Sequence, residues 1–356
     1  MEHGGDIESY RGAYRGSIID FSSNINPLGI HEKVKESMVR ALDLSNRYPD
    51  RHYRALKKSL AEFMGCSEES VVVGNGAMEI IDHCIRMFPG IYIAEPCFNE
   101  YGGIAENERK TVRRFFMEPP FSLNVDAFIE NMPRGVLTIL TNPNNPTGYV
   151  LRNDEIAKIY KAVEARDGYL LMDETFIEFV DLHDMDPSFG FNLPRMIKVR
   201  AATKSAALAG VRLGFASMPR DLKEAFEKHQ LPWTVNRIAS EAGQVLKDLD
   251  DYFEESRHYV AKERRRLMEA IDSSSIGKAY KSEANFILIE LKNIPSKVAF
   301  AFLLERGILV RTYSDEVLKG YIRIAVRRKE ENNQFIDAWK SLERSAVHVY
   351  QSAEKN

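Results

Sequence analysis

The stretch from Arg200 to Gly214 holds the residues whose types and spacing point most directly to chemistry. Lys204 stands there among small residues, and Arg212 follows it eight positions later. Because burying a lysine ammonium is costly, small neighbours indicate that something bulky must come close to the amine. A lysine that forms a Schiff base with a flat cofactor has that need, and a nearby arginine could bind a phosphate. Taken alone, an exposed loop would explain this stretch equally well.

A glycine turn is the second candidate. The sequence Val71-Val-Val-Gly-Asn-Gly-Ala77 predicts a strand, a tight turn and the start of a helix. The backbone amides of Gly76 and Ala77 would be free at this helix start, where the helix macrodipole adds a positive potential. Tight turns use paired glycines for many other reasons, so the turn is a weak sign by itself. Together with Arg212, it favours a phosphate-binding site.

Two further loops also follow apolar runs. The loop Thr141-Asn-Pro-Asn-Asn-Pro-Thr-Gly148 contains two Asn-Pro pairs, which favour a rigid, extended turn. Asn145 in this loop could donate its side-chain amide to a ligand oxygen. Phe98, which follows the apolar run 91–94, could stack on a planar ring. It could equally be a hydrophobic plug between a loop and the sheet.

Asp173 directly follows the apolar run 169–172. An ionised carboxylate in such a place is costly unless it is paired. A protonated ring nitrogen would be a suitable partner, because the carboxylate would keep the nitrogen cationic and the ring electron-withdrawing. The alternative is an aspartate that caps the following helix.

These side chains share one feature, because each follows an apolar run that predicts a strand. The predicted strands include residues 91–94, 136–140, 169–172, 196–199 and 214–217. Continuous apolar strands that alternate with helices indicate an α/β fold with a mostly parallel sheet covered on both faces. In such sheets, ligands bind in the loops at the carboxyl ends of the strands.

The predicted organisation has three parts. Residues 1–30 form an arm that packs with the small domain and active site, with a possible short strand at 18–21; residues 31–264 form a large domain, and residues 265–356 a small α+β domain. Helical patterns cover residues 31–43, 52–65 and about 251–273. The small domain is expected to contain a strand at 285–291, a helix at 296–305, strands at 307–311 and 320–326, and a helix at 330–342.

Composition narrows the class of protein. The 356 residues carry a formal net charge of −3, which gives no sign of nucleic-acid binding, and the basic run 262–266 is expected to be a solvated helix face. The cysteines Cys66, Cys84 and Cys97 match no metal-ligand spacing and suggest no disulfide framework. No apolar run is long enough to span a membrane, and the first residues lack the features of a signal peptide. A cytoplasmic enzyme is the expectation.

Taken in order, these motifs resemble those of the fold-type-I pyridoxal-phosphate enzymes, the aspartate aminotransferase superfamily. The resemblance implies a large domain with a seven-stranded, mostly parallel sheet and a smaller α+β C-terminal domain. It also implies that Lys204 forms the Schiff base with pyridoxal 5'-phosphate and that Asp173 pairs with the pyridine nitrogen. The other implied cofactor ligands are Asn145 for the phenolic oxygen, Phe98 for ring stacking, and Gly76, Ala77, Thr203 and Arg212 for the phosphate.

The segment Asn46-Arg-Tyr-Pro-Asp50 resembles a family segment that reaches the neighbouring subunit. By this resemblance, Tyr48 contacts the cofactor phosphate of the other subunit. The expected assembly is therefore a homodimer with shared active sites.

Within the superfamily, the chain looks like the branch of histidinol-phosphate aminotransferases and L-threonine-O-3-phosphate decarboxylases. Four stretches resemble the decarboxylases of cobalamin synthesis: His3 to Asp6, Asp20 to Gly29, Asp173 to Phe179 and Gln230 to Asn236. Phe176 stands where the aminotransferases typically have tyrosine. The substrate would be a small phosphorylated amino acid. The resemblance implies His3, Asn24, Arg311 and Arg323 as its ligands, with Arg323 for the carboxylate and Arg311 for the phosphate.

The expected reaction is the decarboxylation of L-threonine O-3-phosphate to (R)-1-amino-2-propanol O-2-phosphate, and two alternatives stay open. Ala201 stands where this branch usually has a hydroxyl residue, and Ser205 to Gly210 resemble the aminotransferase loop. An aminotransferase of the histidinol-phosphate type is therefore the first alternative. A binding or regulatory protein without turnover is the second.

Overall fold

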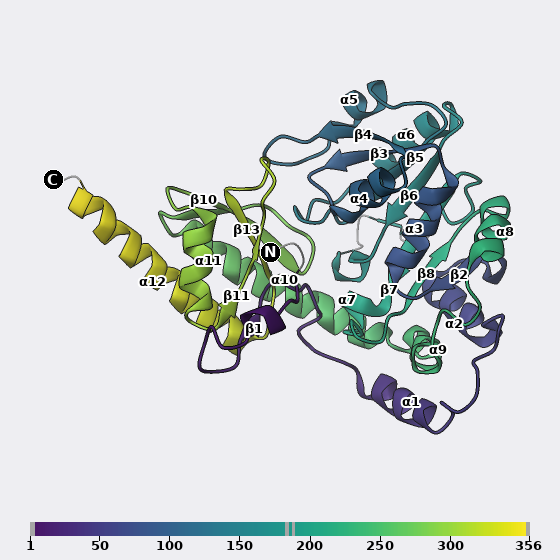
Figure 1. The fold of residues 1–356 in the computed structure, drawn as a ribbon, viewed down its shortest axis with the longest axis horizontal. Helices are drawn as coiled ribbons and strands as arrows, with labels where there is room; N and C mark the ends of the chain where they lie inside the picture. The colour runs from purple at the N-terminus through teal and green to yellow at the C-terminus, as the bar shows by residue number, and fades with distance from the viewer. Residues whose placement is uncertain (1–3, 182–184, 187–188, 354–356) are drawn as a thin grey trace. The chain divides into compact units, whose positions relative to one another are not determined.

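The chain folds into two compact units in the computed structural model, which describes residues 4–181, 185–186 and 189–353. The large unit comprises Leu28–Asn145 and Tyr149–Glu255. The small unit comprises Met1–Pro27, Pro146–Gly148 and Ser256–Asn356. Figure 1 traces both along the chain.

A seven-stranded sheet forms the centre of the large unit. Its strands are β2 (Val71–Gly74), β3 (Gly90–Glu95), β4 (Thr111–Phe116), β5 (Leu137–Thr141), β6 (Tyr169–Asp173), β7 (Met196–Ala201) and β8 (Gly214–Ser217), in the order β2-β8-β7-β6-β5-β3-β4. The strands β7, β6, β5, β3 and β4 run parallel to one another, whereas β8 is antiparallel to both β2 and β7. The predicted α/β fold with a mostly parallel seven-stranded sheet is confirmed.

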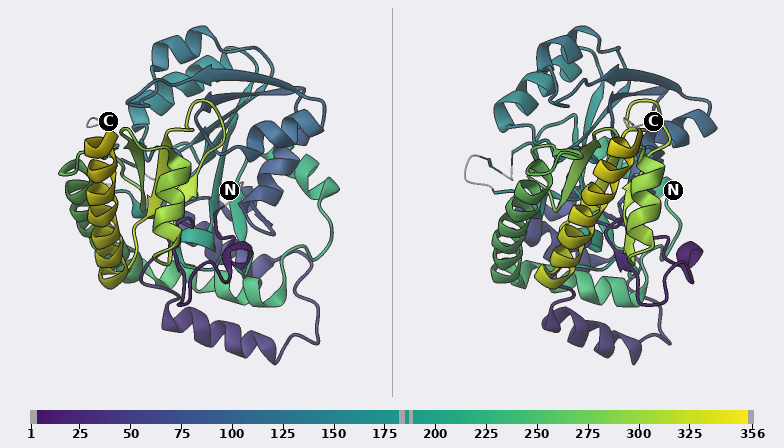
Figure 2. Two further views of the ribbon diagram at one scale, coloured as in Figure 1. Left: turned by 60° about the vertical axis from the view of Figure 1, so that its left-hand side comes forward. Right: turned by 90° about the vertical axis from the view of Figure 1, so that its left-hand side faces the viewer.

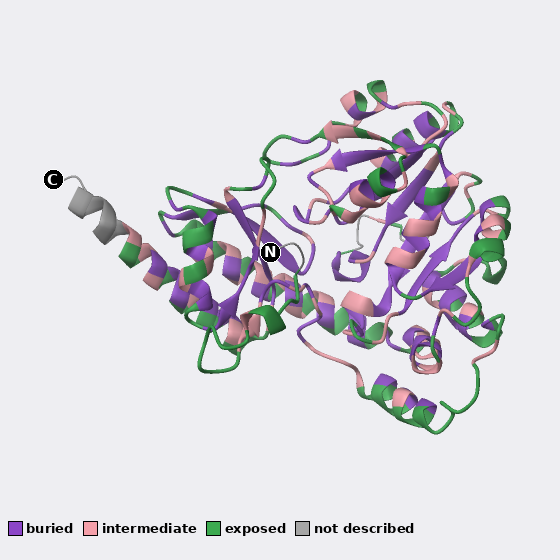
Figure 3. Cartoon of the chain, viewed as in Figure 1, coloured by how far each residue is buried: buried purple, intermediate pink, exposed green. Residues whose placement is uncertain are grey.

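Helices cover both faces of this sheet. Their bounds are α1 (Glu32–Leu42), α2 (Arg54–Met64), α3 (Ala77–Met87), α4 (Glu100–Asn107), α5 (Val125–Glu130), α6 (Asn153–Glu164), α7 (Ala202–Ser205), α8 (Arg220–His229) and α9 (Arg237–Gln244). Successive valines of β2 point to opposite faces, as strand geometry requires. Val72 packs in a core with side chains of α3, α4 and α8, whereas Val71 and Val73 pack with α1, α2 and α9. The buried strands stand out in Figure 3.

The edge strand β4 is absent from the predictions. It pairs only with β3 among the described strands, and its residues are exposed or half-buried. Arg113 and Arg114 interrupt its apolar residues. Edge strands of this kind carry charges and show no continuous apolar run, which is the signal that revealed the central strands.

The small unit contains two sheets. A four-stranded antiparallel sheet has the order β12-β13-β10-β9, and β1 pairs in parallel with β11. The strand bounds are β1 (Ile19–Asp20), β9 (Gly277–Ala279), β10 (Phe286–Leu291), β11 (Ile308–Leu309), β12 (Arg311–Thr312) and β13 (Tyr321–Ala325). The single strand predicted at 307–311 is wrong, because β11 joins β1 while β12 joins β13.

The helices of the small unit are α11 (Ser296–Leu304) and α12 (Lys329–Ala353), together with most of α10 (Asp250–Asp272), which begins in the large unit. Figure 2 shows α11 and α12 side by side, and the two helices are in contact. The expectation of a fully solvated basic face on α10 is wrong in part. Glu263 is buried, and Arg264 donates a 2.7 Å hydrogen bond to the Ala284 carbonyl, so burial lowers the pKa of Arg264 to about 10.

Two further features concern the described part of the chain. Cys66, Cys84 and Cys97 are free thiols. Among the helices that the structure describes, none combines the length and the apolar character needed to cross a membrane.

Candidate functional site

Four candidate side chains follow neighbouring strands of the large sheet. Lys204 lies in α7 directly after β7, and Asp173 is the last residue of β6. Asn145 follows β5, and Phe98 follows β3. These strands are parallel neighbours in the order β7-β6-β5-β3, so all four residues lie at the same edge of the sheet.

The glycine turn and Arg212 meet at this edge. Gly214, the first residue of β8, pairs with Gly74 on one side and with Ala201 on the other. A Cβ atom added to Gly76 would collide with the guanidinium of Arg212, and one added to Gly214 would collide with the peptide between Gly76 and Ala77. Only glycines permit this close approach. The Gly76 amide, which was expected to be free, donates to the Gly74 carbonyl at 2.8 Å. The Ala77 amide at the start of α3 and the Arg212 guanidinium therefore form one anion cradle, which fits a phosphate group.

The backbone at the cradle adopts unusual conformations. Gly76 has φ +83°, and Arg212 has φ +65° although it carries a side chain. A left-handed conformation is costly for residues other than glycine, and such strain is concentrated at functional sites. The Ala202 amide donates to the Leu213 carbonyl at 3.1 Å, which ties the start of α7 to the arginine segment.

Lys204 and Thr203 are half-buried, whereas the small residues Ala201, Ala202 and Ala206 around them are buried. The lysine therefore stands on a short helix that is packed into the sheet edge. The alternative interpretation was that the stretch from Arg200 to Gly214 is an exposed loop. Within this stretch only Ala209 and Gly210 are exposed.

Asp173 is buried and receives three hydrogen bonds. Tyr101 donates its hydroxyl to Oδ2 at 2.6 Å, and Thr175 donates its amide at 3.0 Å and its hydroxyl at 2.5 Å to Oδ1. Burial raises the pKa of Asp173, and the bonds from Thr175 and Tyr101 lower it. The carboxylate thus closes the turn after β6, and the expectation that it caps the following helix is wrong, because Phe176 is the N-cap of the 3-10 helix Ile177–Phe179. A carboxylate oxygen can accept more than one hydrogen bond, so these bonds leave capacity for a ligand.

Asn142 closes the Asn-Pro loop at its base. Asn142 accepts the Leu151 amide at 2.8 Å and donates to the Leu151 carbonyl at 3.1 Å, which closes the loop. Asn145 is half-buried near its tip. Phe98 packs against the core beside α3 and α4, with its ring edge-on to Tyr101 at 5.7 Å.

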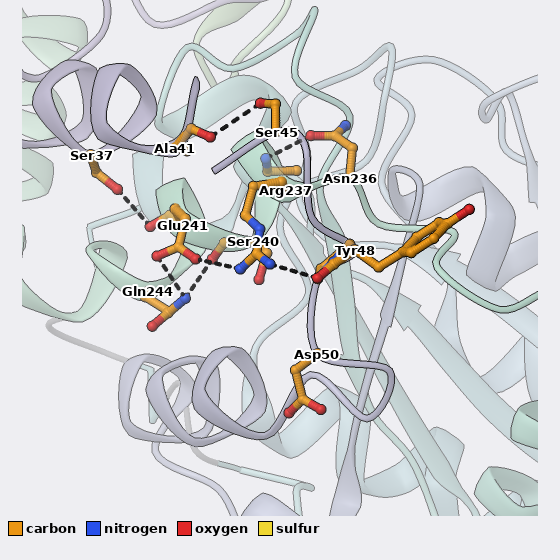
Figure 4. Close-up of polar contacts among 12 residues, drawn as sticks. Ser37, Ala41, Ser45, Tyr48, Asp50, Asn236, Arg237, Ser240, Glu241 and Gln244 are labelled. Carbon is orange, nitrogen blue, oxygen red and sulfur yellow. Dashed lines mark hydrogen bonds and ion pairs between the residues drawn. The ribbon is translucent and has the colours of Figure 1, made fainter. Parts of the chain in front are cut away.

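Tyr48 belongs to the same unit but presents its ring to solvent. The residue is 75% exposed, and its ring packs against Trp233 with centroids 4.5 Å apart and the ring planes tilted by 30°. Arg237 Nη2 donates to the Tyr48 carbonyl at 2.6 Å. Figure 4 shows this bond and the phenol directed away from Arg237.

The remaining candidates belong to the small unit. Arg311 on β12 and Arg323 on β13 are direct cross-strand partners, and both are buried. Arg323 donates to the Ser22 carbonyl at 2.7 Å, and burial lowers the pKa of Arg311. Asn24 is buried, and its carbonyl accepts Asn285 Nδ2 at 3.0 Å. His3 lies outside the described residues.

Two residues at the large-unit site were missed at the level of sequence. Tyr101 and Glu79 each lie in the first turns of a helix after a predicted strand. Glu79 accepts a hydrogen bond from the backbone amide of Asn75, the residue that precedes Gly76 in the cradle. A glutamate at the third position of a helix is a known capping signal, so Glu79 could have been recognised. The partner of Tyr101 lies 72 residues away along the chain.

Comparison with known proteins adds four similarities. The sequence profile of the family described as Aminotransferase class I and II matches residues 16–338. A protein of Caldanaerobacter subterraneus subsp. tengcongensis named "Putative threonine-phosphate decarboxylase" is 36% identical over 97% of this chain and 95% of its own length. "Histidinol-phosphate aminotransferase 2" of Archaeoglobus fulgidus is 32% identical over 91% of this chain and 93% of its own. The histidinol-phosphate aminotransferase of Clostridium acetobutylicum matches in structure with a TM-score of 0.85 and 28% identity, over 91% of this chain and 99% of that one.

Proposed function

This chain belongs to the class I and II aminotransferase family, and from that premise we propose that it is a decarboxylase of L-threonine O-3-phosphate that uses pyridoxal 5'-phosphate. The product would be (R)-1-amino-2-propanol O-2-phosphate, a side-chain precursor of cobalamin. The observation that carries the proposal is the 36% identity, over nearly the whole length of both chains, to the relative with a decarboxylase name.

The large-unit site has the residue types that this cofactor needs. Lys204 would carry it covalently, Asp173 would hold the pyridine nitrogen protonated, and Asn145 and Phe98 would bind the ring. The anion cradle of Gly76, Ala77, Thr203 and Arg212 would hold its phosphate. The bound cofactor would supply an electron sink for a bond that breaks at the substrate Cα.

The electrostatics of Asp173 suit this role. A buried carboxylate favours a neighbouring cation, because the pair offsets part of the desolvation cost of both. Tyr101 and Thr175 orient the two oxygens and favour the ionised form. These bonds would hold the ionised carboxylate in place to accept a hydrogen bond from a protonated ring nitrogen.

The small unit would supply the substrate ligands. We propose Arg323 for the carboxylate, Arg311 for the substrate phosphate, and His3 and Asn24 of the arm as further contacts. Two guanidiniums suit two anionic groups, because each forms paired hydrogen bonds with planar or tetrahedral oxyanions. The way in which Arg323 holds the carboxylate would decide whether carbon dioxide leaves or whether Lys204 removes the Cα proton.

Phe176 supports decarboxylation over transamination. It is 4% exposed and follows the Asp173 turn. Its ring has no hydroxyl, so it cannot hydrogen-bond a cofactor oxygen as a tyrosine could. Asn145 would then provide the side-chain contact to the phenolic oxygen.

The second candidate is an aminotransferase that acts on histidinol phosphate. The residues from Ser205 to Gly210 favour it, as does the relative that is 32% identical. Both reactions would use the same cofactor residues, so the cofactor assignment does not separate them.

We further propose that the active protein is a homodimer. Tyr48 is held at its backbone by Arg237 and at its ring by Trp233, yet the residue is 75% exposed. A large aromatic that is fixed and exposed is suited to contact a partner. Tyr48 would reach the cofactor phosphate of the partner subunit.

The deciding experiment measures carbon dioxide from L-threonine O-3-phosphate with the loaded protein. We expect one carbon dioxide for each substrate consumed, with the cofactor remaining in its aldehyde form. Histidinol phosphate with 2-oxoglutarate should give little turnover. Conversion to pyridoxamine phosphate without carbon dioxide would favour the aminotransferase, and binding without any reaction would favour a protein without turnover.

A further inference from the structure

The segment Gln230–Arg237, here called the bracing segment, lies outside the candidate cofactor residues but is attached to several of the elements that carry them. Its side chains and backbone bond to the end of β2, the first turn of α3, the residue before Arg212 and the residues beside Tyr48. All of these belong to the large unit.

Glu79 and Thr234 form the central connection of the bracing segment. Thr234 Oγ1 lies 2.7 Å from Glu79 Oε1 and 2.8 Å from Oε2, and it donates to this carboxylate. Glu79 Oε2 also accepts the amide of Asn75 in the glycine turn. A Cβ atom on Gly74 would lie 3.1 Å from the same oxygen. One carboxylate therefore fixes the turn of the anion cradle and the bracing segment together.

Two more bonds attach the bracing segment to the two sides of the cradle. Gln230 Nε2 donates to the Val73 carbonyl at 2.6 Å, one residue before the glycine turn. Asn236 Nδ2 donates to the Val211 carbonyl at 3.2 Å, one residue before Arg212. The backbone on both sides of the cradle is therefore bonded to one segment.

The bracing segment also holds the residues around Tyr48. Tyr53 donates its hydroxyl to the Val235 carbonyl at 3.0 Å and accepts the Val235 amide at 3.1 Å. Trp233 Nε1 donates to the Pro49 carbonyl at 3.2 Å, and its ring packs against Tyr48. Arg237 completes this end of the segment with its bond to Tyr48, which Figure 4 displays.

Glu79 places a negative charge close to a site for an anion, which by itself opposes phosphate binding. Its oxygens accept hydrogen bonds from Asn75 and Thr234, however, and this has a positional effect. Because Asn75 donates to Glu79, the turn is held in the conformation in which the Gly76 amide donates to the Gly74 carbonyl at 2.8 Å and the Ala77 amide stands at the start of α3. Thr234 fixes the carboxylate in that place.

We propose that Thr234 and Glu79 are positioning residues that set the geometry of the anion cradle and so determine the affinity for the phosphate of the cofactor. The inference rests on the proposed function, because it assumes that the cradle binds the cofactor phosphate. Neither residue needs to touch the phosphate. Their effect passes through Asn75 and the Gly76 turn.

The test compares two ligands that differ only in the phosphate, pyridoxal 5'-phosphate and pyridoxal. Dissociation constants for the apo protein are measured by absorption and fluorescence titration. Thr234→Val keeps the shape but removes the donor, and Thr234→Ser restores it. Since a hydrogen bond to a charged group contributes on the order of a tenfold factor, Thr234→Val should bind pyridoxal 5'-phosphate roughly 10-fold more weakly. Its affinity for pyridoxal should not change, and Thr234→Ser should match the wild type.

Ser275→Ala is the matched control, because Ser275 donates a hydroxyl to the Glu343 carboxylate at 2.9 Å in the small unit. It should change neither affinity. If Thr234→Val does not fold, Tyr53→Phe replaces it in the test, because this change removes both bonds to Val235. It should also weaken the binding of pyridoxal 5'-phosphate but not that of pyridoxal.

Three outcomes would overturn the inference. Equal weakening of both ligands by Thr234→Val would indicate a general structural role, and no weakening would remove the role entirely. Either result leaves the proposed function standing if the wild type binds pyridoxal 5'-phosphate more tightly than pyridoxal. A wild type that makes no such distinction would overturn both the inference and the assigned phosphate cradle.

Discussion

At the scale of single residues, the structure distinguishes two lysines. Lys198 on β7 is buried, and burial lowers its pKa, yet its ammonium lies 2.9 Å from Glu174 Oε1 and donates to the Phe189 carbonyl. Lys204 is half-buried and stands after the end of the same strand on a short helix. A nucleophilic amine must be reachable by its substrate, and a buried amine within an ion pair is not.

We therefore expect borohydride reduction of the loaded protein to fix the cofactor on Lys204. Peptide mapping should recover the label on the peptide that contains this residue. Lys204→Ala should prevent fixation, whereas Lys198→Met should not, provided that the variant folds. A label on Lys198 would overturn the assignment.

Arg311 gives a second prediction at this scale. Its guanidinium lies 5.4 Å from the centre of the Tyr313 ring and is buried in the small unit. If it binds the substrate phosphate, Arg311→Ala removes a charge-assisted contact, so phosphorylated substrate should bind about tenfold or more weakly. The measurement compares the KM of L-threonine O-3-phosphate with the inhibition constant of L-threonine.

The control for this prediction is Arg306→Ala. Arg306 also lies over an aromatic ring of the small unit, Phe302, but it is more exposed. Its loss should leave both constants unchanged. If Arg311→Ala weakens threonine as much as its phosphate ester, Arg311 does not recognise the phosphate.

The sequence identified residues by type but could not identify their partners. Lys204 and Asp173 could be chosen as candidates because each follows an apolar run, and Arg212 because it stands eight positions after Lys204. Tyr101 was not, because its bond to Asp173 joins residues 72 positions apart. The same is true of Glu79 and Thr234, which are 155 positions apart. Such pairs depend on which strands become neighbours, and only the sheet order determines this.

At the scale of elements, a buried network of charges joins β7 to the residues that follow β6. Glu174 pairs with Lys198 at 2.9 Å and with Arg200 at 3.0 Å, and Arg200 also lies 3.9 Å from Glu178. Burial raises the pKa of Glu178 to about 7, and Arg200 lowers it in part, while the charge of Glu174 raises it. Glu174, Lys198 and Arg200 are thus paired closely, and Glu178 is the least compensated member.

This network predicts a pH dependence of stability. The pKa of Glu178 is about 7 in the folded protein and about 4.5 in the unfolded chain, so the folded protein binds this proton more tightly. The stability gained from the protonated carboxyl is therefore fully present below pH 4.5 and is lost as the pH rises through 7. Glu178→Gln imitates the protonated form and should not lose this contribution. At pH 8 the variant should be more stable than the wild type by roughly 3 kcal/mol, at about 1.4 kcal/mol for each pKa unit.

Urea unfolding at pH 5 and pH 8 provides the measurement. At pH 5 the wild type and Glu178→Gln should differ little. Glu62→Gln is a control, because Glu62 also pairs with a basic residue, Lys247, but on the surface. A variant that is less stable than the wild type at pH 8 would show that ionised Glu178 stabilises the network through Arg200.

At the element scale, the sequence predicted those strands whose residues are almost all buried. The strands β5, β6 and β7 have neighbouring strands on both sides and buried residues, so their sequences are nearly continuous apolar runs. The helix α2 begins two residues later than expected, because Tyr53 before it has a left-handed φ of 51°. The strands β9 and β12 are too short to leave a period in the sequence.

At the scale of the whole molecule, the proposed dimer makes each active site a joint product of two chains. Lys204 of one subunit would act with Tyr48 of the other. Consider a mixed dimer in which one subunit has an altered Lys204 and the other has an altered Tyr48. In this arrangement both altered residues belong to the same active site. The opposite site of that dimer then receives two intact residues.

Mixing subunits that carry Lys204→Ala with subunits that carry Tyr48→Ala tests this. Each variant alone should be weakly active or inactive. After random exchange, half of the dimers are mixed and each has one intact site, so the activity should rise to about a quarter of the wild-type value. Exchange of Lys204→Ala with Thr203→Ala, two positions that belong to one site in one subunit, is the control and should restore no activity. The first mixture could also recover no activity although native mass spectrometry detects mixed dimers. This result would mean that Tyr48 contributes to the active site of its own subunit or to neither site.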